Sequence, residues 1–237
     1  MQWLGSLLFT AFLFVWTPLY AVFFIIAASL MPYHQRFILV RVWAGVLLRM
    51  LRWTCRLDYR VEGLQNLPSG NHVALWKHSS SWETIAQSLV FPDQAWVLKR
   101  ELMWIPFVGW GLKLLRAIAV NRGAGGSAVR QVVEQGRARL DDGVWIVVFP
   151  EGTRMPAGQT RKYGVSGALL ASQTGKLVVP VAHDAGYFWP RRGLLKKPGT
   201  ITVRIGPPIV AEGRDPREVN LEAQQWIEAH STGAAAS

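Results

Sequence analysis

The chain begins with a long stretch without charged residues, and this limits how its first thirty residues can fold. From Leu4 to Met31 the sequence LGSLLFTAFLFVWTPLYAVFFIIAASLM contains no Asp, Glu, Lys or Arg. About 20 apolar residues in a helix cross the hydrocarbon core of a bilayer, so a longer run predicts a membrane helix, tilted or kinked at Pro18. We therefore expect residues 1–33 to form a transmembrane anchor.

A cleaved signal peptide is the alternative interpretation of this stretch. Signal peptides carry positive charge before a shorter apolar region, whereas no Lys or Arg precedes the run here. The nearby positive charges all follow it, at Arg36, Arg41, Arg49, Arg52 and Arg56. By the positive-inside rule, this distribution favours a retained anchor that leaves the rest of the chain on the cytoplasmic side of the membrane.

The residues that follow have the pattern of an amphipathic helix with a basic face. At 3.6 residues per turn, apolar side chains fill one broad arc, and the opposite arc holds Arg41, Arg49, Arg52 and Arg56. We expect residues 34–60 to lie on anionic lipid as an interfacial helix. A helix of the protein core with one solvated face is the alternative.

The charge balance points to an anionic partner. The chain has 237 residues, enough for one domain with an appendage, and its formal net charge is +11. Such a charge suits nucleic acid, a lipid surface or phosphorylated substrates, and composition alone does not choose among them. Cys55 is the single cysteine, which excludes an intrachain disulfide and a zinc site with several cysteines.

Beyond residue 60, short apolar runs alternate with helical patterns. This alternation predicts an α/β domain over residues 61–230, with a largely parallel sheet flanked by helices. The tail STGAAAS, residues 231–237, is expected to be disordered. We expect strands at 72–75, 95–98, 118–120, 144–149, 177–181 and 201–205, and helices at 81–90, 127–140, 166–174 and from Asp215 onward.

The stretch WKHSSSWETIAQ places an imidazole and a carboxylate just after the first of these strands. His78 would lie in the loop and Glu83 in the first turn of the next helix. A general base with the acid that orients it is one interpretation, because a carboxylate at Nδ1 fixes the tautomer. The alternative is a capping box, in which Glu83 only bonds back to the backbone of Ser80.

A second stretch, VVFPEGTR at residues 147–154, bears on this choice. It presents Glu151, Thr153 and Arg154 at the end of a buried strand, after a turn at Gly152. Together with the His and acid of the first stretch, it resembles the motifs of the glycerolipid acyltransferase family, and most closely those of the 1-acylglycerol-3-phosphate acyltransferases. The family pattern has Asp where this chain has Glu83.

Other segments extend the resemblance in the same order along the chain. LRAIAVNR, which ends at Arg122, is similar to the apolar family segment that ends in Arg. LKRELMWIPFVGWG resembles the segment in which a lysine, here Lys99, helps to hold the substrate phosphate. VVPVAHDAG, around Pro180, resembles a short apolar strand with a central proline.

The resemblance implies a fold, a reaction and the residues that perform it. The fold would be that of glycerol-phosphate acyltransferases, and the reaction acyl transfer to the free hydroxyl of lysophosphatidic acid, giving phosphatidic acid. The donor would be acyl-CoA or acyl carrier protein, with no cofactor and no acyl-enzyme. His78 would be the general base, oriented by Glu83.

The same resemblance implies where the phosphate of the acceptor binds. Arg154, Lys99 and Arg122 would hold it, and Glu151 would orient Arg154 or contact the glycerol hydroxyl. Gly152 and Thr153 complete this substrate-binding turn. Arg161 and Lys162 are further candidates for phosphate contacts.

Alternative functions remain open at this point. The acceptor could be glycerol 3-phosphate or another lysophospholipid. A basic, non-catalytic, membrane-associated binding protein is an alternative of another class, although the tryptophans do not interleave with a basic groove as nucleic-acid binding would require. His72 and His78 lack the spacing of a helical zinc motif, so no metal is expected. Membrane lipids, the acceptor and the donor are the expected partners.

Overall fold

One mixed sheet forms the centre of the computed structural model, which describes residues 2–121, 123 and 125–231. Its strands run in the order β1, β7, β6, β2, β5, β3, β4, and β8 pairs with β6. The pairs are parallel except where β6 meets β7 and β8. The predicted α/β class with a largely parallel sheet is therefore confirmed. The strand bounds are Leu57–Glu62, Val73–Trp76, Gln94–Lys99, Ile118–Val120, Trp145–Val148, Leu177–His183, Gly199–Ile205 and Ile209–Val210, for β1 to β8.

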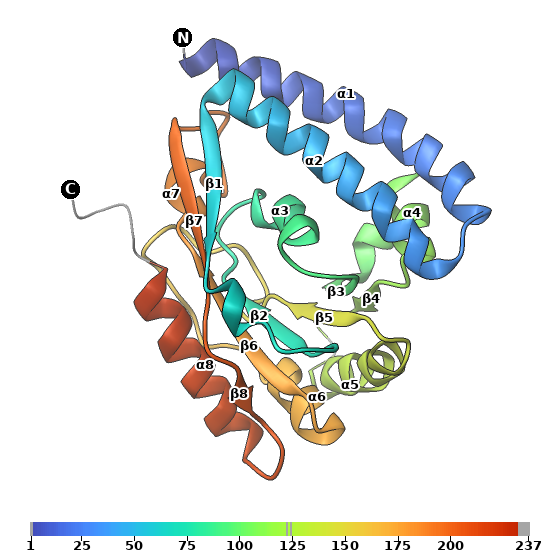
Figure 1. Cartoon of the computed structure of the whole chain (residues 1–237), viewed down its shortest axis with the longest axis vertical. Coiled ribbons are helices and arrows are strands. Elements are labelled where there is room, and N and C mark those ends of the chain that lie inside the picture. The colour runs from blue at the N-terminus through green and yellow to red at the C-terminus, as the bar shows by residue number, and fades with distance from the viewer. Residues whose placement is uncertain (1, 122, 124, 232–237) are drawn as a thin grey trace.

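Helices cover both faces of this sheet (Figure 1). One face carries α5 (Gly126–Asp141), α6 (Ser166–Thr174) and α8 (Pro216–His230). The other carries α3 (Glu83–Val90) and α2 (Arg36–Cys55), and α1 (Gln2–Ser29) lies outside α2. Shorter elements complete the chain, namely α4 (Val108–Leu114), α7 (Ala185–Phe188) and the 3-10 helices Tyr33–Gln35, Leu64–Asn66 and Arg100–Trp104.

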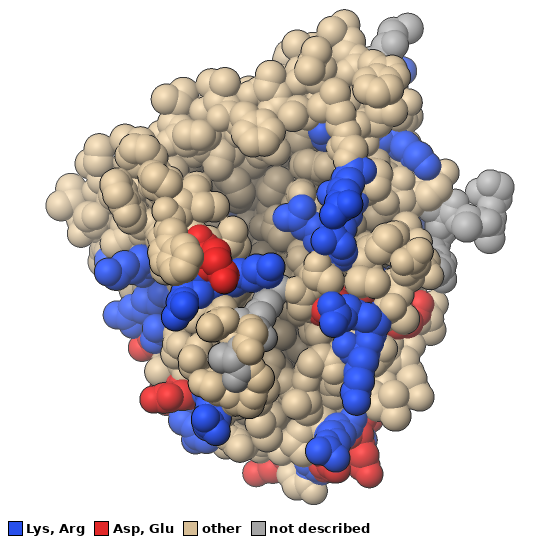
Figure 2. Space-filling view, turned by 180° about the vertical axis from the view of Figure 1, so that it is seen from behind, with Lys and Arg blue, Asp and Glu red and all other residues tan. Residues whose placement is uncertain are grey.

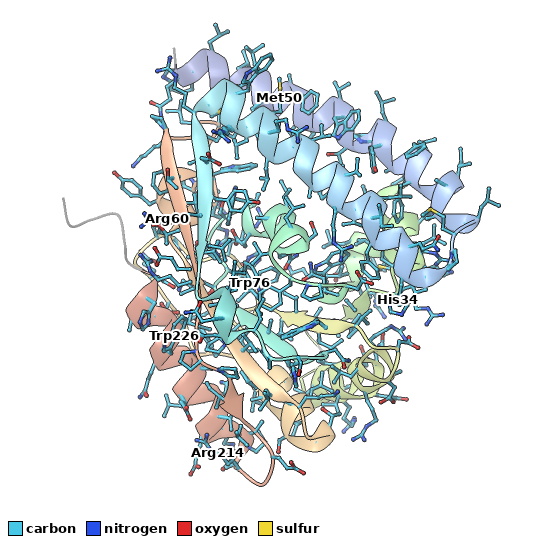
Figure 3. All side chains as sticks on the ribbon, viewed as in Figure 1. His34, Met50, Arg60, Trp76, Arg214 and Trp226 are labelled. Carbon is cyan, nitrogen blue, oxygen red and sulfur yellow. The ribbon has the colours of Figure 1, made fainter. Side chains whose placement is uncertain are left out.

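Side-chain alternation along the central strand builds a core on each face. In β2, Val73 and Leu75 pack toward α5, α6 and α8, whereas Ala74 and Trp76 pack toward α2 and α3. Successive residues of a strand point to opposite faces, so a strand in the middle of a covered sheet is apolar on both. Trp76, fully buried, fills much of the space between the sheet and α3 (Figure 3).

The first helix packs against the domain along one face and exposes the other. Phe9 and Phe24 are buried against the domain, while Phe14 and Leu19 on the other face are mostly exposed. At Gly5 the contact is so close that a Cβ would lie 2.1 Å from the carbonyl oxygen of Thr54. This helix is long and apolar enough to cross a bilayer. One face is thus available to lipid and the other belongs to the protein.

The second helix contributes its apolar face to the core. Val40, Leu47 and Leu51 are buried against the domain. The interfacial position expected for residues 34–60 stays a prediction. Arg41 pairs with Asp93 on the outside. Strand β1 begins at Leu57, so the range 34–60 expected for this helix also contains the start of a strand.

Two helix starts and the C-terminal tail can be compared with the expectations from the sequence. Asp215 caps α8, because its carboxylate accepts the backbone N–H of Arg217 at 2.8 Å. The helix expected from Ser81 begins two residues later, at Glu83. Of the expected tail, only Ser231 lies within the described residues.

Candidate active site

Four neighbouring strands bring the chemistry-bearing residues together at one edge of the sheet. In the order β6, β2, β5 and β3, their carboxyl ends lead to His183, His78, Glu151 and Lys99. Parallel neighbours end at the same edge, and ligands of α/β proteins bind beyond that edge. Residues that are far apart in the sequence therefore meet for a topological reason.

The imidazole of His78 is held by the carboxylate of Glu83. The Nδ1 atom of His78 lies 2.9 Å from Oε1 of Glu83, and the Glu83 side chain is fully buried. The same Oε1 accepts the backbone N–H groups of Ser79 at 2.9 Å and Ser80 at 2.8 Å, while Ser80 Oγ accepts the N–H of Trp82 at 3.1 Å. Glu83 thus makes the capping bond and the histidine contact at once, so the two interpretations are compatible.

The free nitrogen of His78 is the one that faces substrate space. Burial raises the pKa of Glu83, but the neighbouring imidazoles of His183 and His78 and the backbone N–H of Ser80 lower it by more, so this pKa lies below its ordinary value. An ionised carboxylate at Nδ1 fixes the proton there and leaves Nε2 as the basic atom. Within the described chain Nε2 forms no hydrogen bond, and the ring stacks on Phe149 with centroids 4.2 Å apart.

A second histidine lies on the far side of the same carboxylate. His183 is fully buried, and Nε2 lies 3.9 Å from Glu83 Oε2, an oxygen that accepts no hydrogen bond from any described residue. Nε2–H donates to the carbonyl of Lys77 at 2.8 Å, and Nδ1 accepts the N–H of Ala185 at 3.2 Å. Burial lowers the pKa of His183, so it stays neutral. It thereby fixes the carbonyl that immediately precedes His78.

The FPEGTR turn holds the backbone of His78. Glu151 Oε2 accepts the backbone N–H of His78 at 2.6 Å, and the N–H of Met155 donates to the His78 carbonyl at 2.7 Å. The other oxygen of Glu151 accepts the ammonium group of Lys77 at 2.8 Å. Among the described residues no contact joins Glu151 to Arg154, and the expected role of Glu151 toward Arg154 or the glycerol hydroxyl stays a prediction. The turn instead serves the position of His78.

Sequence reasoning missed a buried ion cluster behind this turn. The side chain of Lys77 is 3% exposed, and its ammonium lies 2.8 Å from Glu151 and 2.8 Å from both oxygens of Glu228 on α8. Tyr163 also donates to Glu228, at 2.6 Å. Burial, together with the neighbouring charge of Glu228, raises the pKa of Glu151 to about 7 despite Lys77. A lysine next to the histidine was the only local sign, since Glu228 lies far away in the sequence.

A cavity of about 540 Å³ opens at His78. Its mouth is basic, with Lys99, Arg154 and Arg191 among the lining residues. Its apolar part reaches under the N-terminal helices, where α1 contributes Tyr20 and Phe24, α2 contributes Val40 and Trp43, and α4 contributes Leu112. Figure 2 shows a hollowed face with Lys and Arg side chains gathered beside it.

The other predicted binding residues divide into three groups. Gly152, Thr153 and Arg154 line the cavity, and Gly152 takes a φ of 68° that favours glycine in this turn. Arg161 and Lys162 are exposed and are not among the residues that line it. Arg122 lies outside the described residues. No motif pointed to Arg191, which reaches the mouth from the loop after α7.

Comparisons with known proteins bear on the family of this chain. A family model described as Acyltransferase matches residues 58–184. The 1-acyl-sn-glycerol-3-phosphate acyltransferase of Pseudomonas aeruginosa is 43% identical over 225 residues, which cover 93% of this chain and 86% of that protein. The mouse 1-acyl-sn-glycerol-3-phosphate acyltransferase alpha is 27% identical, with 73% of this chain and 62% of that protein covered.

A solved structure has the same fold. The 1-acyl-sn-glycerophosphate acyltransferase of Thermotoga maritima superposes with a TM-score of 0.79 at 23% identity, covering 98% of this chain and 95% of that one. At this identity the likeness concerns the fold, while the family model and the Pseudomonas relative concern the family. The chain therefore belongs to the acyltransferase family.

Proposed function

We propose that this acyltransferase moves an acyl group from the thioester of acyl-CoA or acyl carrier protein to the free hydroxyl of lysophosphatidic acid, giving phosphatidic acid. The observation that carries the proposal is the position of His78, bound to Glu83 at 2.9 Å, between a basic mouth and an apolar channel. A phosphate suits the mouth and an acyl chain suits the channel. The names of the relatives support the same acceptor.

His78 would act as a general base without forming a covalent intermediate. Nε2 removes the proton of the acceptor hydroxyl as that oxygen attacks the thioester carbonyl, and the C–S bond breaks as the new ester forms. The imidazolium then returns its proton to the departing thiolate. Glu83 stabilises the imidazolium through the hydrogen bond at Nδ1.

The phosphate of the acceptor would bind at the mouth of the cavity. Arg154 is our first candidate, because it adjoins the turn that fixes His78 and a guanidinium matches phosphate oxygens with two parallel donors. Lys99 lines the same cavity from the end of β3. Arg122 stays a proposal from the family motif alone. Gly152 and Thr153 would shape the floor of this subsite.

The enzyme would take up lysophosphatidic acid and release phosphatidic acid at the membrane. We place the exposed face of α1 in the lipid, with Phe14, Leu19 and Ile26 among its contacts, while the opposite face lines the cavity. The positive charges that follow α1 favour the cytoplasmic side for the domain. In this placement the channel that leads to His78 begins at the bilayer surface, where lysophosphatidic acid resides.

Other acceptors are the closest alternatives. Glycerol 3-phosphate would use the basic mouth equally well, and a different lysophospholipid would use the channel. The non-catalytic binding protein loses its support, since the histidine and its carboxylate are both in place and the chain belongs to a family of enzymes.

The test is an acyl-transfer assay with purified protein, a panel of phosphorylated acceptors and both donor types. We expect transfer to lysophosphatidic acid, and a loss of about 10²- to 10⁴-fold in His78→Ala, as for removal of a general base. The variant should still sediment with membranes, because α1 is unchanged. Transfer to glycerol 3-phosphate alone would contradict the proposed acceptor, and near-normal turnover of His78→Ala would contradict the proposed base.

A further inference from the structure

A second basic cavity adjoins the active site. It measures about 490 Å³ and is lined by Pro156 and Ala157 after the FPEGTR turn, Gly186 and Tyr187 of α7, and the loop that follows α7. That loop supplies Pro190 and three exposed cations, Arg191, Arg192 and Lys197. Arg191 also lines the cavity at His78, so the two cavities share this residue.

These three cations have no carboxylate partner among the residues that the structure describes. Within the described chain, Arg191, Arg192 and Lys197 pair with no carboxylate, whereas Arg41 and Arg52 of α2 pair with Asp93 and Asp58. The ammonium group of Lys197 instead rests 3.9 Å from the ring centroid of Tyr187. A positively charged cavity without internal counter-ions attracts anions.

The loop that carries the cations is anchored at its end. The backbone N–H of Lys196 donates to Ser6 Oγ at 2.9 Å, and that of Lys197 donates to the carbonyl of Phe188 at 2.8 Å. The side chain of Lys196 is buried and donates to Thr10 and to the carbonyl of Leu194. One lysine of the loop is thus structural, and its neighbour Lys197 is left free to meet a ligand.

The chemistry of the two substrates decides which one this cavity fits, an argument that rests on the proposed function. In lysophosphatidic acid the phosphate and the reacting hydroxyl are on neighbouring carbons, so that phosphate must bind beside His78. In the acyl donor the phosphates lie at the far end of the pantetheine arm, well away from the thioester. A second set of cations that extends beyond the catalytic cavity is what the donor requires.

We infer that the cavity between the FPEGTR turn and the loop after α7 binds the phosphates of the acyl donor, with Arg192 and Lys197 as ligands and Arg191 at the junction. The thioester would lie at His78, and the pantetheine arm would pass Arg191 into the second cavity. The nucleotide phosphates of CoA and the phosphodiester of acyl carrier protein share this chemistry.

The experiment compares two doubly neutralised variants in detergent micelles. Arg192→Gln/Lys197→Gln removes two cations of the cavity, and Arg130→Gln/Arg217→Gln removes two exposed cations elsewhere, on α5 and α8, as a control for net charge. Calorimetric titration with unacylated CoA measures donor binding without turnover. Steady-state assays give KM separately for palmitoyl-CoA, for palmitoyl carrier protein and for lysophosphatidic acid.

We expect the cavity variant to raise the CoA Kd and the palmitoyl-CoA KM about tenfold, as for two exposed phosphate contacts together, with the acceptor KM unchanged. Dephospho-CoA should bind the wild-type protein more weakly than CoA does. Its affinity should fall less than that of CoA when the two cations are replaced. The control should match wild type. A higher KM for palmitoyl carrier protein alone would support the same phosphate site and identify the carrier as the source.

Three results would overturn the inference. A raised acceptor KM with unchanged donor constants would make the cavity part of the acceptor site. Weaker binding to phosphatidylglycerol vesicles with unchanged donor constants would make the loop a lipid contact. Unchanged Kd and KM values for every substrate would show that Arg192 and Lys197 do not bind the donor phosphates. The titration with CoA does not need turnover, so failure of the proposed acceptor would be seen separately in the wild-type assay.

Discussion

Replacing Glu83 by glutamine separates the charge of this side chain from its shape. The amide oxygen of the substituted side chain can still accept the three N–H groups that reach Oε1 in the wild type, from His78, Ser79 and Ser80. The negative charge beside the imidazole is lost. We therefore expect Glu83→Gln to fold normally and to lose most of its turnover.

The expected magnitude follows from the contact itself. The Nδ1 to Oε1 distance of 2.9 Å puts the centres of the two charges roughly 4 Å apart when the imidazole is protonated. At an effective dielectric constant of about 20, that interaction is worth about 4 kcal/mol. It exists only once His78 has taken the proton, so kcat should fall by about 10³-fold.

The assay is steady-state acyl transfer to lysophosphatidic acid, with thermal unfolding measured in parallel. Ser80→Ala is the matched control, because it removes the hydroxyl that accepts the N–H of Trp82 and leaves the contact between Glu83 and His78 in place. It should cost about 1 kcal/mol of stability and little turnover. A kcat loss below tenfold in Glu83→Gln, or an equal kcat loss in Ser80→Ala, would refute the catalytic role of the carboxylate.

Three further substitutions test the surroundings of His78. Lys77→Met leaves the carboxylates of Glu151 and Glu228 without their buried cation, so unfolding measurements should show a loss of about 3 to 5 kcal/mol and the surviving folded enzyme a lower kcat. The pKa of Glu151 is raised to about 7 from an ordinary value of 4.5, so the folded state holds this proton more tightly than the unfolded state. The stability that protonated Glu151 contributes is complete below pH 4.5 and is lost as pH rises through 7. The Tm of Glu151→Gln should accordingly fall less than that of wild type between about pH 5 and about pH 8, and an identical fall would contradict the raised pKa. Arg154→Ala should raise KM for lysophosphatidic acid at least about tenfold and leave the KM for palmitoyl-CoA nearly unchanged, whereas an unchanged acceptor KM would rule out its phosphate role.

Much of the fold followed from local patterns, and the exceptions have physical causes. The strands of the sheet interior are covered on both faces, so they appear as short apolar runs in the sequence. Strand β1 was missed because it is an edge strand with the polar sequence LDYRVE, and only Arg56, in a left-handed conformation with φ of 53°, separates it from α2. Helix α4 was missed because proline and glycines interrupt its neighbourhood.

The sequence predicted the parts of the candidate site in which a motif directly follows a strand. It did not predict contacts between segments that lie far apart in the sequence. His78 and Glu151 each follow a strand, and parallel neighbours place those ends together. The hydrogen bond from the His78 N–H to Glu151 depends on exact atomic positions, which the spacing of residues in the sequence does not give. Glu228 reaches Lys77 from the last helix, and nothing near either residue in the sequence signals the partner.

Lys77 and Glu228 form an ion pair but lie far apart in the sequence, and this separation affects the order in which the active site can form during synthesis. Ribosomes add residues from the N-terminus, so α1 emerges before the domain and can meet lipid while the domain is still unfinished. The loop that carries His78 gains its last support only when α8 has been synthesised, and β1 gains its partner β7 shortly before that. A nascent chain halted before residue 228 would therefore hold a membrane-bound but incompletely supported active site. Acyl transfer should begin only after α8 has been synthesised.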